Sequence, residues 1–149
     1  MKIFLIFCLL LLTDFSTASA ATSHGRSPCR LEVDNAHIST NLINKEAKRA
    51  VKVTFRSVCN VDQSDLEMHV QILKTGINGN HPVTSIVTQK FPIVKANRDV
   101  IIQNIFAYCK NTKRTTYYGI ANAKAHIGGE LVVANQVQSN LLVALNCGT

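Results

Sequence analysis

The side chains with the clearest chemistry in this sequence are four cysteines, Cys29, Cys59, Cys109 and Cys147. A fifth, Cys8, lies in an apolar run at the N-terminus. No two of the four are close enough to form the Cys-x-x-Cys knuckle of a zinc site. An even number of cysteines in an exported chain is typical of a disulfide framework. We therefore predict two disulfides and no metal ligands among these residues.

The pairing of the four cysteines is open at this point, because four cysteines allow three connectivities. We favour Cys29 with Cys59 and Cys109 with Cys147, which closes each half of the chain separately. The alternative joins Cys59 to Cys109 across two sheets and Cys29 to Cys147 at the chain ends. Identifying the partner of a single cysteine distinguishes these possibilities.

Carboxylates are few, and most fall in segments with the composition of turns. The densest group is Asp62, Asp65 and Glu67. It lacks the glycine and the spacing of a calcium loop, so we interpret these residues as turn caps. The histidines stand singly, whereas a zinc site needs three or four convergent ligands. The sequence therefore predicts no metal and no cofactor.

No pattern in the sequence indicates a catalytic centre. Disulfide-bonded cysteines provide no thiolate, and the sequence has no Gly-x-Ser-x-Gly elbow. The glycines at 76–79 and 128–129 are not followed by a phosphate-binding motif. Triads and glycosidase acid pairs are defined by position in space, so a hydrolase stays as the weakest alternative. We expect a protein that is not an enzyme.

One cluster has the composition of a binding surface. Lys113 and Arg114 are followed closely by Tyr117 and Tyr118, and tyrosine and arginine are enriched in binding hot spots. The competing interpretation is that these are ordinary strand tyrosines, one buried and one flanking it. Stacking aromatics interleaved with basic residues are scarce, which disfavours nucleic acid as a partner.

The net charge of the chain is +7. Such a charge favours contact with anionic surfaces, although it also serves solubility alone. We expect the partner to be an anionic cell-surface polymer or another extracellular protein.

The N-terminus predicts export. Met1-Lys2 carries a positive charge, Ile3–Leu12 is apolar, and Ala18-Ser19-Ala20 is a small-residue cleavage site, so residues 1–20 have the layout of a signal peptide. The apolar run is shorter than the ~20 residues that span a bilayer. We expect residues 21–28 to form a flexible tail and residues 29–149 to form the folded domain. The product is then secreted, with no transmembrane segment after cleavage.

The elements that must position these side chains are β-strands. Val51–Cys59 and Leu66–Thr75 alternate between apolar and polar residues, as half-buried strands do. Val100–Cys109 is apolar on both parities and is expected to be covered on both faces. Val83–Val94 contains a proline and follows another, which predicts an edge strand or a crossing between sheets. Ala36–Ala47 is interpreted as an extended piece and a turn, because asparagine and β-branched residues disfavour a helix.

Several short strands without a helical period predict an antiparallel, immunoglobulin-like β-sandwich of about seven strands. Val51, Val53 and Phe55 are expected on its core face, and Lys52 and Arg56 on its solvent face. The sequence has no tryptophan, so the core tryptophan of antibody domains is missing. The architecture does not depend on that residue.

The segments around the cysteines resemble a family. Cys29 precedes Val-Asp-Asn-Ala-His-Ile-Ser at 33–39, and the second half contains Cys109, Tyr-Tyr-Gly at 117–119, and Cys147 followed by glycine. This pattern resembles uncharacterised small secreted proteins of actinomycete-type bacteria. The resemblance implies a two-disulfide β-sandwich and export. It carries no activity and no site residues.

These observations favour a secreted, non-enzymatic β-sandwich that binds a ligand or associates with the cell envelope. An alternative is a secreted inhibitor or effector that docks another protein, through the basic hairpin Lys110–Tyr118 or the turn Gly76–His81. An extracellular hydrolase is a weaker alternative.

Overall fold

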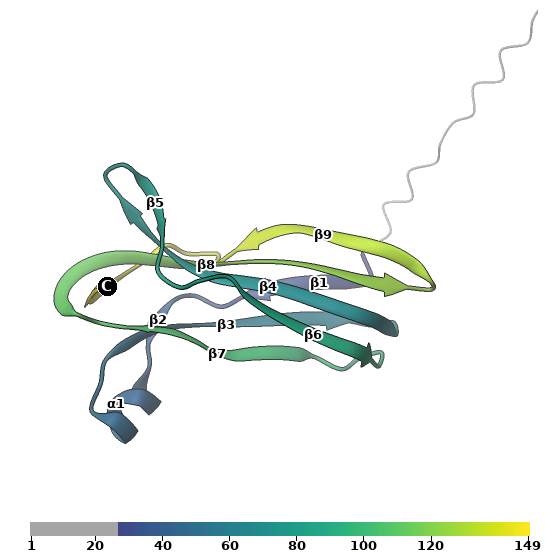
Figure 1. The fold of residues 1–149 in the computed structure, drawn as a ribbon, viewed down its shortest axis with the longest axis horizontal. Helices are drawn as coiled ribbons and strands as arrows, with labels where there is room; N and C mark the ends of the chain where they lie inside the picture. The colour runs from purple at the N-terminus through teal and green to yellow at the C-terminus, as the bar shows by residue number, and fades with distance from the viewer. Residues whose placement is uncertain (1–26) are drawn as a thin grey trace, which may run out of the picture.

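The computed structural model describes residues 27–149 (Figure 1). The expected signal peptide, and residues 21–26 of the expected tail, lie outside the described residues. Strands make up 68% of the described chain, and there is one short helix, α1 (Thr40–Glu46). The ten strands are β1 (Cys29–Val33), β2 (His37–Ile38), β3 (Ala50–Cys59), β4 (Gln63–Gly76), β5 (Gly79–Pro82), β6 (Val87–Val94), β7 (Val100–Tyr108), β8 (Asn111–Ile127), β9 (Glu130–Gln138) and β10 (Val143–Gly148).

The strands form two antiparallel sheets of unequal width. In the first, β1 and β2 pair with successive parts of one edge of β3, and β7 pairs with the other edge. In the second, β4 and β8 are central; β5 and β6 share the free edge of β4, while β9 and β10 share that of β8. The ten strands therefore occupy seven lanes, where a lane is one strand position across a sheet. The first sheet has three lanes and the second has four. The prediction of about seven strands is therefore too low, because the short edge strands β2 and β5 lie in segments interpreted as an extended piece and a turn.

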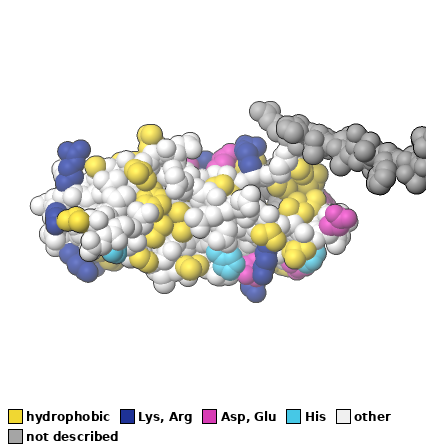
Figure 2. Space-filling view, turned by 90° about the horizontal axis from the view of Figure 1, so that it is seen from above, with side chains coloured by type: hydrophobic (Ala, Val, Ile, Leu, Met, Phe, Trp, Pro, Cys, Tyr) yellow, Lys and Arg dark blue, Asp and Glu magenta, His cyan; other side chains and the backbone are white. Residues whose placement is uncertain are grey.

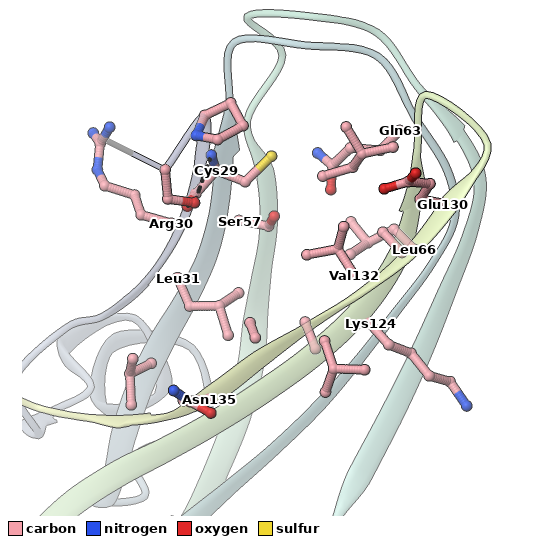
Figure 3. A pocket seen from close by; sticks show the side chains of 18 residues that line it. Cys29, Arg30, Leu31, Ser57, Gln63, Leu66, Lys124, Glu130, Val132 and Asn135 are labelled. Atoms are coloured by element: carbon pink, nitrogen blue, oxygen red, sulfur yellow. Dashed lines mark hydrogen bonds between the residues drawn. The ribbon is translucent and has the colours of Figure 1, made fainter. Parts of the chain in front are cut away.

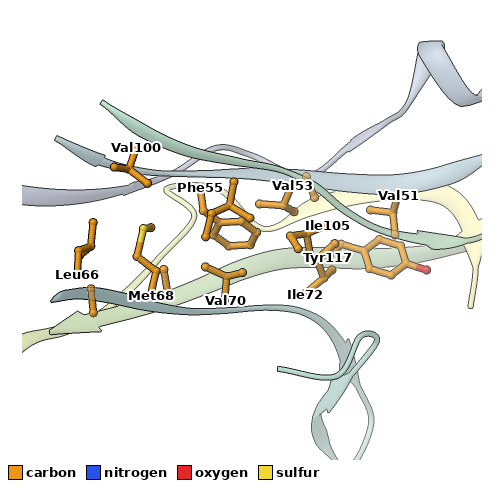
Figure 4. Packing of buried hydrophobic residues seen from close by; sticks show 14 of the residues in the cluster. Val51, Val53, Phe55, Leu66, Met68, Val70, Ile72, Val100, Ile105 and Tyr117 are labelled. Carbon is orange, nitrogen blue, oxygen red and sulfur yellow. The ribbon is translucent and has the colours of Figure 1, made fainter. Parts of the chain in front are cut away.

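One hydrophobic core lies between the inner faces of the two sheets (Figure 4). The alternation predicted for β3 and β4 is confirmed, because the inward apolar residues over 51–55 and 66–72 are each at most 1% exposed. These inward residues are Val51, Val53, Phe55, Leu66, Met68, Val70 and Ile72. Burying an apolar side chain of this size contributes roughly 1.5–3 kcal/mol, so this layer is the main support of the fold.

Small residues on β8 let the two sheets approach each other closely. A Cβ atom added to Gly119 would lie 2.7 Å from the Cγ1 atoms of both Val33 and Val53, and 3.0 Å from Cε1 of Phe55. Ala121, Ala123 and Ala125 continue the same buried face along β8. This run of small residues is thus the surface against which the first sheet packs.

The helix α1 corrects the prediction of an extended piece and a turn over 36–47. Ser39 caps its N-terminus, with Oγ accepting a hydrogen bond from the Leu42 amide at 3.4 Å. Ala47 ends it in the left-handed region, with φ 53°, and donates its N–H to the Ile43 carbonyl. Caps at both ends compensate for poor intrinsic propensity. The helix buries none of its residues, so it is a surface excursion between β2 and β3.

The prediction that the strand 100–109 is covered on both faces is wrong. Val100 and Ile102 face the core, and an extra residue in β7 then shifts the register so that Ile105 faces the core as well. Ile101 and Tyr108 are 43% and 41% exposed. The reason is that this extra residue changes which parity faces inward, while only the inner face of the first sheet packs against the second.

The edge position predicted for the proline-containing segment is confirmed for β6. Within the described chain β6 pairs with β4 alone. Proline lacks the N–H that a second neighbouring strand would require. The preceding part of that segment, residues 83–86, is not a strand.

The structure contains two disulfides, Cys29–Cys59 and Cys109–Cys147. This is the pairing favoured from the sequence. Cys29 and Cys59 lie directly opposite each other in the register of β1 and β3. Cys109 follows β7 of the first sheet, whereas Cys147 belongs to β10 of the second. The second disulfide therefore also links the two sheets.

Candidate functional site

A pocket of about 560 Å³ lies where β1 of the first sheet faces β9 of the second (Figure 3). Its size falls within the range of roughly 300–1,000 Å³ typical of small-ligand sites. Residues from β1, β3, β4, β8 and β9 line it. Both sheets therefore contribute walls to a space that is large enough for a small organic ligand.

The pocket exists because the sheets differ in width. Val132, Ala134 and Val137 of β9 are opposite Ala125, Ala123 and Ala121 of β8, so all six side chains face inward. The first sheet ends at β1 and does not reach across β9. Val132 consequently faces inward and yet is 44% exposed. β9, at the edge of the wider second sheet, therefore extends beyond β1, at the edge of the narrower first sheet. The inner face of β9 forms one wall of the pocket.

The walls of the pocket are mainly apolar. Leu31 of β1 stands opposite Val132 of β9, and Leu66 and Ala123 contribute from the central strands (Figure 3). Ser57, which is buried, faces the same space from β3. A site of this kind holds apolar groups by the hydrophobic effect and depends on a few polar groups for orientation.

Gln63 is the polar group of the pocket that has no partner. The residue opens β4 and is 3% exposed, and its Nε2 atom has no hydrogen-bond partner in the described chain. A buried donor left unsatisfied costs roughly 1–3 kcal/mol. Gln63 therefore combines a destabilising environment with a location beside an open cavity.

The charged residues of the pocket lie at its rim and are partly neutralised. Arg30 Nε lies 2.7 Å from Glu32 Oε1, and Lys124 Nζ lies 3.4 Å from Glu67 Oε1. The third charged lining residue, Glu130, makes no ion pair within the described residues. The two cations thus face carboxylates outside the cavity, and one free carboxylate remains at its edge.

The acidic group singled out in the sequence does not converge on one point. Asp62 accepts hydrogen bonds from Lys95 Nζ at 2.9 Å and from the Ala96 amide at 2.8 Å, which together lower its pKa. Asp65 instead lies 3.5 Å from His126. Residues 27–149 contain no cluster of three or more potential metal-ligating side chains. Asp62 thus caps the turn at 95–98, whereas Asp65 and Glu67 lie within β4 and are not the turn caps that were predicted.

Glu67 is the centre of an ion network on the outer face of the second sheet. Its carboxylate lies 3.2 Å from Lys90 Nζ, 3.4 Å from Lys124 Nζ and 2.9 Å from His69 Nε2. The hydrogen bond from Lys90, with the nearby charge of Lys124, lowers the pKa of Glu67 against the opposing effect of burial. The network joins β4, β6 and β8 across the sheet, and its member Lys124 also lies at the rim of the pocket.

The predicted patch of Lys113, Arg114, Tyr117 and Tyr118 is wrong in its tyrosines. Lys113 and Arg114 are exposed, but Tyr117 and Tyr118 are 0% and 5% exposed. The Tyr117 hydroxyl donates a hydrogen bond to the Cys147 carbonyl, and burial raises the pKa of Tyr118. Tyr117 belongs to the core between the two sheets, whereas Tyr118 lies on the other parity of β8 and is buried outside that core. Only the two cations remain available at the surface.

A second, shallower cleft brings together basic residues that are distant in the sequence. Lys48, Arg49 and Lys110 line it together with Tyr108, and its volume is about 530 Å³. The Tyr108 hydroxyl donates to Glu46 Oε2 at 2.8 Å, which raises the pKa of Tyr108. Pairing of β3 with β7 creates the cleft, since Ala50 is opposite Tyr108. The basic hairpin singled out in the sequence, Lys110–Tyr118, contributes only its first residues, 110–112, to this cleft.

The apolar pocket is the feature that the sequence did not reveal. The nearest signal is three consecutive apolar residues, Leu131, Val132 and Val133, which are 59%, 44% and 68% exposed. Figure 2 looks onto this side of the molecule and shows apolar side chains gathered at the end where β9 lies, with Lys and Arg both beside this group and at the opposite end. Such a run is equally typical of a buried strand.

Comparison with known proteins assigns no family: no family model matches this chain, and no similar protein is found among curated ones. The one helix within residues 27–149, α1, is not long and apolar enough to cross a membrane.

Proposed function

We propose that this chain is an exported, non-enzymatic binding protein with an immunoglobulin-like β-sandwich fold. The strand order supports the architecture, since β1-β3-β7 corresponds to strands A-B-E of that fold and β4-β8-β9 to strands C-F-G. The position of β6 beside β4 corresponds to the additional C′ strand. The leader-like N-terminus and the two disulfides support export.

The single observation that supports binding best is the open apolar pocket between β1 and β9. Its lining residues provide one carboxylate, Glu130, and no histidine, while Cys29 is engaged in a disulfide. General acid–base and nucleophilic chemistry need a positioned pair of such groups. The pocket therefore suits the capture of an apolar group rather than its conversion.

Two variants on β9 test this proposal. N-phenyl-1-naphthylamine, an apolar fluorescent probe, is titrated into the full chain produced through an export pathway. We expect saturable binding that Val132→Phe abolishes, because the new ring fills the pocket. Leu131→Phe is the matched control, since Leu131 lies on the opposite face of the same strand and outside the pocket lining.

The same material tests the other parts of the proposal. N-terminal sequencing is expected to show cleavage after Ala20. Binding that does not saturate, or that Val132→Phe leaves unchanged, would contradict a role for the pocket. Turnover of ester or polysaccharide substrates by the purified protein would favour the hydrolase alternative.

Association with an anionic envelope polymer is a second candidate, favoured by the basic cleft. Lys48, Arg49 and Lys110 line this cleft together. Binding to immobilised polyglutamate is expected to weaken as salt rises, because screening acts on exposed charges. The double variant Arg49→Gln/Lys110→Gln should weaken it several-fold more than Lys90→Gln/Lys95→Gln, which removes equal charge elsewhere. Equal losses would indicate a non-specific effect of net charge.

Docking of another protein is the remaining alternative, favoured by the hairpin of β4 and β5. This hairpin projects from the body of the domain (Figure 1), and Ile77 at its turn is fully exposed. An extracellular partner bound through the hairpin should be lost on Ile77→Ser and retained on Val132→Phe. Retention in both variants would exclude the hairpin as the docking element.

A further inference from the structure

We propose that the pocket between β1 and β9 binds a free, neutral, single-chain acyl compound whose carbonyl oxygen accepts a hydrogen bond from Gln63 Nε2. This inference rests on the proposed binding function and specifies its ligand class. It derives from three properties of the pocket: an unpartnered donor, an elongated apolar lining and the charge at its rim.

The donor sets the polar part of the ligand. Buried polar groups are almost always hydrogen-bonded in folded proteins, and Gln63 Nε2 is an exception beside a cavity. Gln71, on the same strand, shows the usual situation, since its Nε2 donates to the Thr84 carbonyl at 2.8 Å. The missing partner of Gln63 must be an acceptor, and a carbonyl oxygen in the pocket supplies one.

The lining sets the apolar part of the ligand. Figure 3 shows the side chains arranged along β9, with Gln63 and Glu130 at one end and Asn135 at the other. Between these ends the pocket is walled by aliphatic residues such as Leu31, Leu66 and Val132. An elongated aliphatic site suits a linear hydrocarbon chain, which gains about 0.8 kcal/mol for each buried methylene.

The charge at the rim favours a neutral head group. Glu130 is at the same end of the pocket as Gln63 (Figure 3), and a ligand carboxylate there would face a like charge. The cations at the rim, Arg30 and Lys124, already have carboxylate partners in Glu32 and Glu67. An ester or amide carbonyl satisfies Gln63 without adding a second negative charge.

Matched ligands test the carbonyl directly. Displacement of N-phenyl-1-naphthylamine is measured with 1-lauroylglycerol, which is an ester, and with 1-dodecylglycerol, the ether that keeps the head group and a chain of the same carbon number and lacks the carbonyl. Both are used below their critical micelle concentrations, so that only free molecules bind. We expect the full chain to bind the ester about tenfold more tightly, which is the effect of one hydrogen bond that satisfies a buried donor.

Matched variants test the donor. Gln63→Met keeps the length of the side chain and removes the amide, so the ester and the ether should bind it equally. Gln71→Met removes an amide that already has a partner and should keep the tenfold preference. In the unaltered protein, each methylene added to the acyl chain should tighten binding about fourfold until the pocket is full. Circular dichroism verifies that both variants fold.

The outcomes separate this inference from the proposed function. Equal binding of ester and ether by the unaltered protein, or a preference that survives Gln63→Met, overturns the inference while leaving a binding pocket. Tighter binding of laurate than of 1-lauroylglycerol also overturns it, because the ligand class would then be a carboxylate. Failure of the probe and of all the lipids to bind would reject the binding function itself.

Discussion

The side-chain amide of Gln63 is important to the proposed site because its nitrogen has no hydrogen-bond partner in the described chain. Its amide nitrogen is buried beside the pocket with no acceptor in the described chain. A buried donor that stays unsatisfied costs roughly 1–3 kcal/mol. In the proposed complex, the ligand carbonyl accepts a hydrogen bond from this nitrogen and removes that cost. The unsatisfied amide thus links lower stability of the free protein to ligand binding.

Removing the amide of Gln63 should therefore not harm the free protein. Gln63→Met is expected to leave the free energy of unfolding unchanged or raise it by about 1 kcal/mol, because the unsatisfied donor disappears. Gln71→Met should lower it by about 1 kcal/mol, because the hydrogen bond to Thr84 is lost. Urea unfolding of both variants without ligand measures this. A larger loss for Gln63→Met than for Gln71→Met would mean that Gln63 has a structural role.

At Gly119, by contrast, an added side-chain atom should lower the stability of the protein. Gly119→Ala should destabilise the protein by about 1–3 kcal/mol, because the new Cβ would lie 2.7 Å from Val33 and Val53. Thermal unfolding followed by circular dichroism measures the change. The double variant Gly119→Ala/Val53→Ala should lose less than the sum of the two single changes, since the smaller residue makes room. Additive losses would show that the two positions are not in contact.

At the scale of elements, the second sheet is held on its outer face by charge as well as by backbone pairing. Glu67 of β4 lies among Lys90 of β6, Lys124 of β8 and His69. The pKa of Glu67 is lowered in the folded protein. The ionised form is therefore favoured by folding, and its stabilising effect is present above the ordinary carboxyl pKa of 4.5 and lost as the pH falls through the folded-state value.

Acid unfolding should reveal this contribution. In the unaltered protein the urea midpoint should fall as the pH drops below about 4.5, where the unfolded chain binds more protons at position 67 than the folded chain. Glu67→Gln should reduce this fall, since it removes the titrating group. Glu130→Gln, which alters a carboxylate outside the network, should leave the pH dependence as it was. The same slope for all three proteins would contradict a role for the Glu67 network.

At the scale of the whole molecule, the unequal widths of the two sheets create the pocket, and the disulfides hold its surroundings. Cys29 lies in the pocket lining, and its bond to Cys59 holds β1 against β3. The bond between Cys109 and Cys147 links the two sheets through residues outside the pocket lining. The two bonds therefore differ in what they position.

Removing each disulfide should separate stability from binding. In the chain-entropy description, bonds with sequence separations of 30 and 38 residues each stabilise by about 4 kcal/mol. Alanine at both cysteines of either pair should lower the unfolding free energy to a similar extent. Where the variants stay folded, only loss of Cys29–Cys59 should weaken probe binding, because it releases the β1 wall. Equal weakening by both would mean that the pocket depends on overall stability alone.

Much of the fold was predictable from local patterns. The alternation in Val51–Cys59 correctly identified the residues that face the core, and proline correctly placed β6 at an edge. The helix over 40–46 was missed because its caps, Ser39 and Ala47, outweigh the propensities of the residues between them. The double coverage predicted for the strand 100–109 failed because its apolar parity changes at a bulge.

The candidate site was not predictable, and the reason is physical. The sequence by itself determined which residues alternate, where turns interrupt them and which cysteines are available, since these follow from neighbouring positions along the chain. Only the tertiary structure decided that Tyr117 and Tyr118 are buried and that Val132 faces an opening. Both outcomes depend on which strands lie side by side and on three lanes packing against four. The unpartnered amide of Gln63 is of the same kind, because a missing partner is a property of everything packed around it.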